Sequence, residues 1–173
     1  MNNNSGIIGW DQLKWGDTVE HTLNLYEGLV EITANETIEF GISTFARERK
    51  KLFIERQEFN FFQNKLYSVS LIFYNIDPES DNIIYKKFIE KYGETKEVSG
   101  KKQYIENNIY NDITEVVYRI SEEMIILITV TEKKHKITKE ILRHDVVYNY
   151  FNPKTISEIN SIMAKINTDD IIV

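Results

Sequence analysis

Apolar residues recur every three or four positions in three segments of the chain, 17–27, 81–92 and 153–167. This period places them along one side of an α-helix, with Lys, Glu and Asn on the other sides. The three stripes are Val19, Leu23 and Tyr26; Ile84, Phe88, Ile89 and Tyr92; and Ile156, Ile159, Met163 and Ile166. The pattern therefore predicts three amphipathic helices.

Residues typical of helix ends stand beside all three segments. Asp17 and the glutamate three positions later form a capping-box pattern, and Asn152 with Pro153 is typical of a helix start. Gly28 and Gly93 follow the first two helices, where a left-handed residue commonly ends a helix. No glycine-rich phosphate motif surrounds either glycine, so we interpret both as helix stops and not as ligand-binding turns.

Alternation of apolar and polar residues predicts β-strands elsewhere. The predicted strands are 37–45, 51–61, 65–75, 101–109, 112–120 and 123–131. The segments 65–75 and 123–131 are apolar in both phases, which favours a place in the middle of a sheet. We expect a tight turn at Asn64-Lys65. The stretch 134–150 fits either a helix or a strand, and we favour a strand at 141–151.

Two halves of this pattern resemble each other. Units 15–75 and 77–131 each consist of a helix, a glycine stop and three strands, with the most apolar strand last. We expect one α+β domain over residues 10–151, with an antiparallel sheet of about six or seven strands, helices on one face and a duplicated helix-plus-three-strand unit. Residues 1–9 are expected to be a flexible leader, and 152–173 a C-terminal helix and tail.

Composition narrows the classes of function. The chain has 27 acidic and 21 basic residues and a net charge of −6, whereas nucleic-acid binding requires clustered basic residues. The one basic cluster, Arg47, Arg49, Lys50 and Lys51, is interpreted as a solvated turn, with an anion- or partner-binding patch as the alternative. There is no cysteine, and no apolar stretch is long enough to span a membrane. We expect no nucleic-acid partner and no membrane-spanning segment.

The residues needed for catalysis or metal binding do not form a recognisable motif. His21, His135 and His144 show no metal-ligand spacing, and a satisfied or solvated histidine is the expected role of each. There is no nucleophile motif, no P-loop and no dinucleotide-binding glycine pattern. The abundant carboxylates alternate with apolar residues, as on the wet face of a sheet. We therefore expect a protein that is not an enzyme and holds no cofactor or metal.

Two surfaces are candidates for partner binding. A sheet with helices on one side leaves its other face open. The strand phases place Phe59, Phe61, Tyr104 and Tyr118 opposite the core positions, where aromatic residues anchor partners, although a shift of one residue would place them in the core. The second candidate is the narrow stripe of the C-terminal helix, formed by Ile156, Ile159, Met163 and Ile166. This stripe is expected to cover its own sheet or to pair with another chain.

The stretch GDTVEHTLNLYEG resembles the opening of BamE-type (SmpA/OmlA) outer-membrane lipoprotein domains, through Gly16, Thr18 and Gly28. The chain lacks the proline that usually follows the helix-ending glycine in that family, and no functional residue carries over. An Ile-, Asn-, Lys- and Tyr-rich composition is typical of AT-rich bacteria such as spirochaetes.

The resemblance implies a non-enzymatic protein-binding or scaffolding domain of the bacterial cell envelope. Its location would be the periplasm or the outer membrane, as a lipoprotein whose lipid anchor is missing from this chain. The alternative is a cytoplasmic α+β domain that binds a small ligand between sheet and helices. The oligomeric state and the partner are not determined by the sequence.

Overall fold

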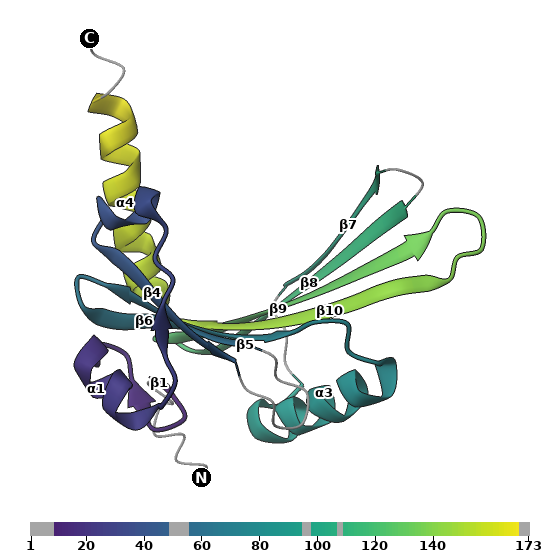
Figure 1. The fold of residues 1–173 in the computed structure, drawn as a ribbon, viewed down its shortest axis with the longest axis horizontal. Coiled ribbons are helices and arrows are strands. Elements are labelled where there is room, and N and C mark those ends of the chain that lie inside the picture. Colours follow the sequence, from purple (N-terminus) through teal and green to yellow (C-terminus); the bar gives the residue numbers. More distant parts are fainter. Residues whose placement is uncertain (1–8, 49–55, 95–97, 107–108, 170–173) are drawn as a thin grey trace.

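Eight strands form one antiparallel sheet in two runs of sequential neighbours (Figure 1). The computed structural model describes residues 9–48, 56–94, 98–106 and 109–169. The first run is β3 (Val30–Glu31), β4 (Ile42–Glu48), β5 (Arg56–Phe62) and β6 (Lys65–Phe73). The second is β7 (Val98–Glu106), β8 (Ile109–Ser121), β9 (Met124–His135) and β10 (Ile141–Phe151). The sheet order is β3-β4-β5-β6-β10-β9-β8-β7, so the last strands of both runs pair at the centre.

Local turn chemistry fixes the β5–β6 hairpin. Gln63 and Asn64 both have positive φ, 49° and 63°, as a two-residue hairpin turn with the twist of the strands requires. The turn therefore lies one residue before the predicted Asn64-Lys65. A register shift between Asn60 and Phe61 follows from a bulge in the same hairpin.

Two helices lie on the same side of the sheet, α1 (Val19–Leu25) and α3 (Pro78–Tyr92) (Figure 1). The N-cap of α1 is Thr18, whose hydroxyl accepts the His21 N–H, and not the predicted Asp17. The N-cap of α3 is Asp77, which accepts the Ser80 N–H at 2.9 Å. A short helix, α2 (Asn35–Ile38), precedes β4, and a two-stranded ribbon, β1 (Gly9–Trp10) with β2 (Leu13–Lys14), precedes α1.

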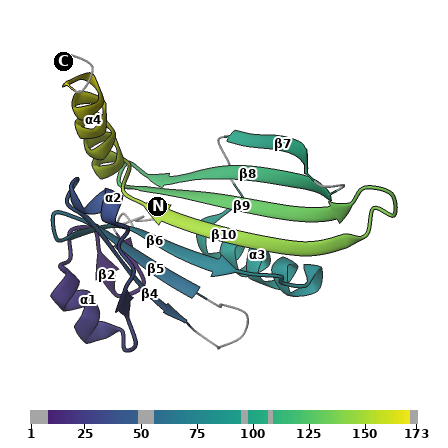
Figure 2. The ribbon, with the colours of Figure 1, turned by 45° about the horizontal axis from the view of Figure 1, so that its top comes forward.

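The third long helix, α4 (Pro153–Asp169), rises from the opposite side of the sheet (Figures 1 and 2). The Asn152 side chain accepts the N–H groups of Lys154 and Thr155, which confirms the predicted cap before Pro153. The helix begins directly after β10 because Pro153 cannot continue a strand ladder but suits the first turn of a helix.

The hydrophobic core lies between the sheet and α1 and α3. Phe88 of α3 contacts the rings of Tyr118 and Tyr148, with centroids 4.8 and 5.5 Å apart. On the α1 side, Trp10 and Phe59 pack edge to face at 5.8 Å. Aromatic pairs of this kind contribute about 0.5–1.5 kcal/mol each beyond their burial.

The α+β class, the antiparallel sheet and the C-terminal helix are confirmed, whereas the details of the duplication differ. The sheet has eight strands and not six or seven, because each helix is followed by four strands and not three. The fourth strand of the first run is β3, which is two residues long. The fourth strand of the second run is β10, and it confirms the strand predicted at 141–151. The predicted strand at 37–45 is wrong in its first half, since α2 occupies residues 35–38. Most of the predicted basic turn, residues 49–51, lies outside the described residues.

Candidate partner-binding surface

One face of the sheet is covered by α1 and α3, and the other is largely open. Burial alternates along β10, where Val146, Tyr148 and Tyr150 are buried and Val147 and Asn149 are half-exposed. The buried residues face α1 and α3, so the half-exposed ones face the opposite side. In Figure 1, the far ends of β7–β10 bend toward the side from which α4 rises. The open face is therefore concave between α4 and these strands.

Four apolar side chains occupy the centre of this face, and we name them the open-face patch. They are Ile72, Val117, Leu127 and Val147. The strand register pairs Ile72 with Val147 and Leu127 with Val117, in adjacent rows of the same face. Val117, Leu127 and Val147 are each half-exposed, and Ile72 is buried. A run of apolar side chains on an uncovered sheet is unusual for a protein surface and is typical of a site that meets another molecule.

The polar residues beside the patch are held in place by the sheet. The Ser70 hydroxyl donates to Asn149 Oδ1 at 2.6 Å across β6 and β10. The Thr44 hydroxyl donates to Asn60 Oδ1 at 2.9 Å across β4 and β5. These neutral hydrogen bonds occupy the polar groups without adding charge. The centre of the face is thus apolar to weakly polar, and the Arg56–Glu58 ion pair borders it, since Arg56 pairs with Ile72 across β5 and β6.

The helix α4 forms one wall of the open face. Ile159 is the most buried of its described side chains, at 6% exposed, while Ile156 and Met163 are half-exposed. At its base, the Lys154 ammonium lies 3.6 Å from the Glu123 carboxylate in the β8–β9 turn. Figure 2 shows the rest of the helix extending beyond the sheet. The apolar stripe of α4 is therefore buried at Ile159 and half-exposed at Ile156 and Met163.

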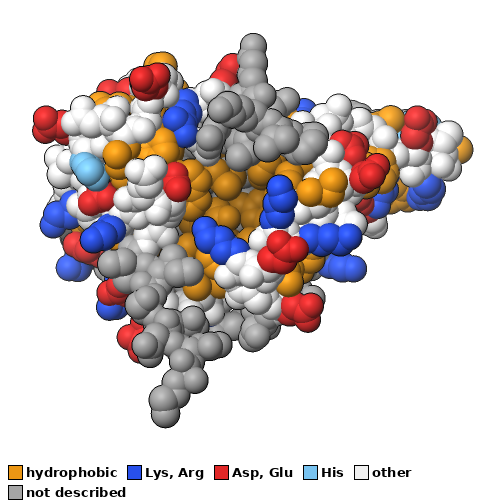
Figure 3. Space-filling model, turned by 90° about the horizontal axis from the view of Figure 1, so that it is seen from below, with side chains coloured by type: hydrophobic (Ala, Val, Ile, Leu, Met, Phe, Trp, Pro, Cys, Tyr) orange, Lys and Arg blue, Asp and Glu red, His pale blue; other side chains and the backbone are white. Residues whose placement is uncertain are grey.

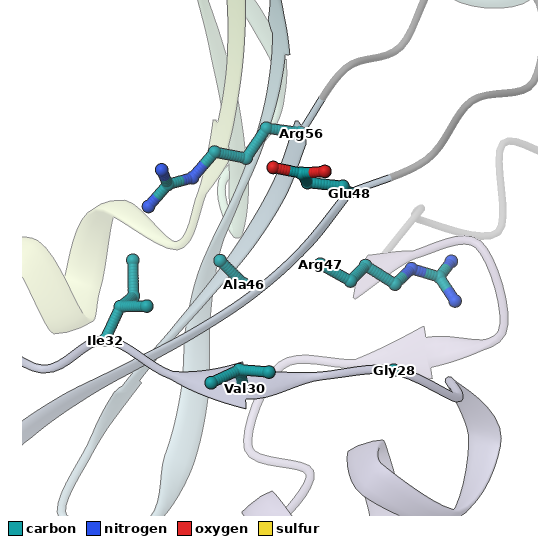
Figure 4. Close-up of a pocket in the computed structure, with 7 residues that line it drawn as sticks. All are labelled: Gly28, Val30, Ile32, Ala46, Arg47, Glu48 and Arg56. Carbon is teal, nitrogen blue, oxygen red and sulfur yellow. The ribbon is translucent and has the colours of Figure 1, made fainter.

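A depression at the edge of the same face is lined by residues of β3, β4 and β5 and has a volume of about 400 Å³ (Figure 4). Arg56 extends from β5 and forms an ion pair with Glu58, Nε to Oε1 at 2.8 Å. Val30 and Ile32 form the outer rim and are 64% and 38% exposed. Their exposure leaves the depression open to solvent along its rim.

Three of the predicted anchor residues lie in the core and not on the open face. Phe59, Phe61 and Tyr118 are fully buried, at 0% exposed, on the side that α1 and α3 cover. The predicted phase of these strands is wrong, because a one-residue shift in phase moves every side chain to the opposite face. Tyr104 pairs with Asn111 near the far end of β7 and is 49% exposed. The side chain of Ile166, at the distal part of α4, lies outside the described residues.

The sequence contained a signal for the open-face patch that the prediction did not use. Strands β6 and β9 are apolar in both phases, and this was interpreted only as evidence for a central position. The central strands of this sheet are covered by helices on one face only. One set of alternating apolar residues therefore faces the helices, and the other set lies on the open face. The residues of this second set are Ile72 and Leu127.

The histidines have structural surroundings. His144 lies between two carboxylates, with Nε2 3.0 Å from Asp81 Oδ2 and Nδ1 3.2 Å from Glu132 Oε1. A hydrogen bond from Lys134 lowers the pKa of Glu132 below its usual range. His144 thus connects the first turn of α3 to β9 and β10, as expected of a satisfied histidine. Among the described residues, no group of three His, Cys, Asp or Glu side chains is arranged to hold a metal ion.

Arg47 is a half-exposed strand residue and not part of a solvated turn. It lies in β4, and its Nε donates to Gln57 Oε1 at 2.7 Å. Its guanidinium carbon lies 4.5 Å from the centroid of the Tyr26 ring. The interpretation of this residue as part of a solvated turn is therefore wrong, because β4 extends past it to Glu48.

Within the described part of the chain, no helix is long and apolar enough to cross a membrane. Comparison with known proteins found no matching family model, no matching curated protein and no matching solved structure.

Proposed function

We propose that the protein is a non-enzymatic binding domain that receives another protein on the open face of its sheet. The observation that carries this proposal is the open-face patch of Ile72, Val117, Leu127 and Val147, which the fold leaves without a helix over it. The four patch residues have the composition of an interface core, apolar and free of charge, and the charged pair Arg56 and Glu58 stands at its border. The concave shape between α4 and the far ends of β7–β10 suits a helix or a loop of a partner (Figure 1).

The alternative proposal is a small ligand bound at the depression beside β3. Its volume of about 400 Å³ falls within the 300–1,000 Å³ typical of ligand pockets. Such pockets bury most of the ligand surface, whereas the rim residues Val30 and Ile32 leave this depression open. A protein partner fits the geometry better, since it can cover the depression and the open-face patch together.

A location in the bacterial cell envelope, as a lipoprotein of the periplasm or outer membrane, is part of the same proposal. It rests on the resemblance of residues 16–28 to BamE-type domains and on no contact in the structure. Fractionation of cells that express the gene with its natural upstream sequence tests it. Recovery in the membrane fraction with a lipid-modified terminus supports the location, and recovery in the cytoplasm overturns it while leaving the binding proposal intact.

Site-specific photo-crosslinking tests the binding proposal. A photoreactive phenylalanine analogue replaces Leu127 on the open face, and in a matched control it replaces Lys136 in the exposed β9–β10 turn. Irradiation of the source cells should give a discrete crosslinked species from position 127 and not from position 136. Equal crosslinking from both positions, or none from position 127 under conditions where the variant is folded, would overturn the proposal.

The same variant distinguishes the two kinds of ligand. A protein partner gives a product heavier than the chain by a protein-sized mass, which a denaturing gel resolves. A small ligand at the depression is tested separately by Ile32→Trp, which fills the space beside β3. Loss of ligand-induced stabilisation in this variant, with no protein-sized product from position 127, would favour the alternative.

A further inference from the structure

A second hollow lies on the helix side of the sheet, opposite the open-face patch. Its floor consists of β6 and β10, through Leu71, Phe73, Tyr148 and Tyr150, and its wall is α3. Viewed from the helix side, apolar side chains gather in a hollow with Lys and Arg side chains near it (Figure 3). Cross-strand pairing places Leu71 beside Tyr148, so the floor is one continuous apolar surface.

The size of this hollow limits what it can accept. Its volume is about 190 Å³, below the range of about 300–1,000 Å³ for small-molecule sites. At about 30 Å³ of liquid volume per water, it corresponds to roughly six waters. This space suits one large aliphatic or aromatic side chain and is too small for a cofactor.

The edge of the hollow carries positive charge. Lys87 and Lys91 line it from successive turns of α3, and both are exposed. Among the residues that the structure describes, neither ammonium is within ion-pair distance of a carboxylate, and Lys91 Nζ lies 4.9 Å from the Tyr92 ring centroid. Residues four apart on a helix have Cβ atoms about 5–6 Å apart. The two ammonium groups can therefore meet two carboxylates on either side of one anchoring side chain.

The floor also contains an unsatisfied polar atom. Tyr148 is 2% exposed, and its hydroxyl has no hydrogen-bond partner among the described residues. A buried hydroxyl without a partner costs free energy, on the order of 1–3 kcal/mol. This hydroxyl is shielded from solvent, so an occupant of the hollow would contact the ring of Tyr148 and not its hydroxyl. Tyr148 therefore contributes apolar surface to the floor, and the polar recognition comes from the lysines at the edge.

We propose that this hollow binds an acidic peptide segment of a partner protein, with one large apolar side chain inserted over Leu71 and Tyr148. In an extended peptide whose anchor points to the floor, the residues on either side of the anchor are about 6.6 Å apart and point away from the floor, toward the mouth of the hollow, where the exposed Lys87 and Lys91 line the edge. The hollow would therefore recognise a short sequence in which one large apolar residue stands between two acidic residues. The site lies on the other side of the sheet from the open-face patch, so either proposal can fail without the other.

The probe is the peptide acetyl-Gly-Glu-Phe-Glu-Gly-amide, titrated to millimolar concentration against the ¹⁵N-labelled protein. We expect shifts of backbone NMR signals that cluster at α3 around Lys87 and Lys91 and at β6 and β10 around Leu71 and Tyr148. The analogue with Ala in place of Phe should bind at least tenfold more weakly, because the anchor is removed. Scattered shifts, or equal binding of both peptides, would overturn the proposal.

Charge reversal tests the role of the lysines. The double variant Lys87→Glu/Lys91→Glu should lose at least tenfold in affinity, and the wild-type affinity should fall with added salt. The matched control, Lys86→Glu/Lys136→Glu, has the same change in net charge at exposed positions that do not line the hollow, and it should retain affinity. An equal loss in both double variants would show that only net charge matters and would overturn the site.

Discussion

Replacing Ile159 with alanine tests whether α4 is docked on its own sheet. Among the helix side chains that the structure describes, Ile159 is the most buried, at 6% exposed. The substitution removes three carbons, and about 0.8 kcal/mol for each gives roughly 2.4 kcal/mol of lost transfer free energy. A cavity adds to this loss, so the free energy of unfolding should fall by about 2–4 kcal/mol. For a chain of this size, that corresponds to a Tm lower by roughly 4–16 °C.

The assay is urea unfolding followed by the fluorescence of the two tryptophans, together with a thermal melt by circular dichroism. The control is Asn160→Ala, an exposed neighbour on the same helix, which should change the free energy of unfolding by less than about 0.5 kcal/mol. Truncation after Phe151 should lower the Tm further than Ile159→Ala, with no change of oligomeric state on sizing. A cost below about 0.5 kcal/mol for Ile159→Ala, or a truncated chain that keeps its Tm but loses a dimer, would show that α4 docks elsewhere.

Three further substitutions test other contacts. His144→Ala should lower the free energy of unfolding by about 1–3 kcal/mol in urea, because Asp81 and Glu132 each lose the contact with the imidazole, whereas exposed His21→Ala should change it little. Gly93→Ala should cost about 1 kcal/mol, since Gly93 has φ of 87°, while Gly100→Ala, with open space around it, should be near neutral. Burial, with a hydrogen bond to a carboxylate, raises the pKa of Tyr26 from 10 to about 12. The neutral phenol therefore stabilises the fold fully below pH 10, and this contribution is lost as the pH rises from 10 to 12. Tyr26→Phe should flatten the pH dependence of the urea midpoint in that range, and an unchanged slope would contradict the assignment.

Local signals in the sequence were sufficient for the helices and for several strands. The helix α4 was predicted from Asn152-Pro153 and the spacing of its isoleucines, and its start at Pro153 is confirmed. Gly93 was predicted as a helix stop, and its φ of 87° at the end of α3 confirms this. Helix caps and helical periodicity depend on residues only a few positions apart in the chain, so both can be recognised from the sequence alone.

Which residues of each strand face the core was decided by the tertiary structure. The residues next to Phe59 and Tyr118 in the sequence do not show which face of each strand is buried. The packing of α3 against Tyr118 and of the N-terminal ribbon against Phe59 decides which face of the sheet is covered. The short strand β3 could not be predicted for a similar reason. Two residues have no periodicity of their own, and β3 exists because β4 offers it hydrogen-bonding partners.

The sequence by itself determined the class of the fold, the helix boundaries to within a few residues and the apolar character of strands β6 and β9. Tertiary structure alone decided which apolar residues form a surface. Ile72 and Leu127 lie 55 positions apart in the sequence, and they come together on the open face because β6 and β10 pair at the centre of the sheet. His144 meets Asp81 across 63 positions for the same reason. Contacts of this range follow from the order and register of strands, which depend on the burial of the whole chain and not on any local pattern.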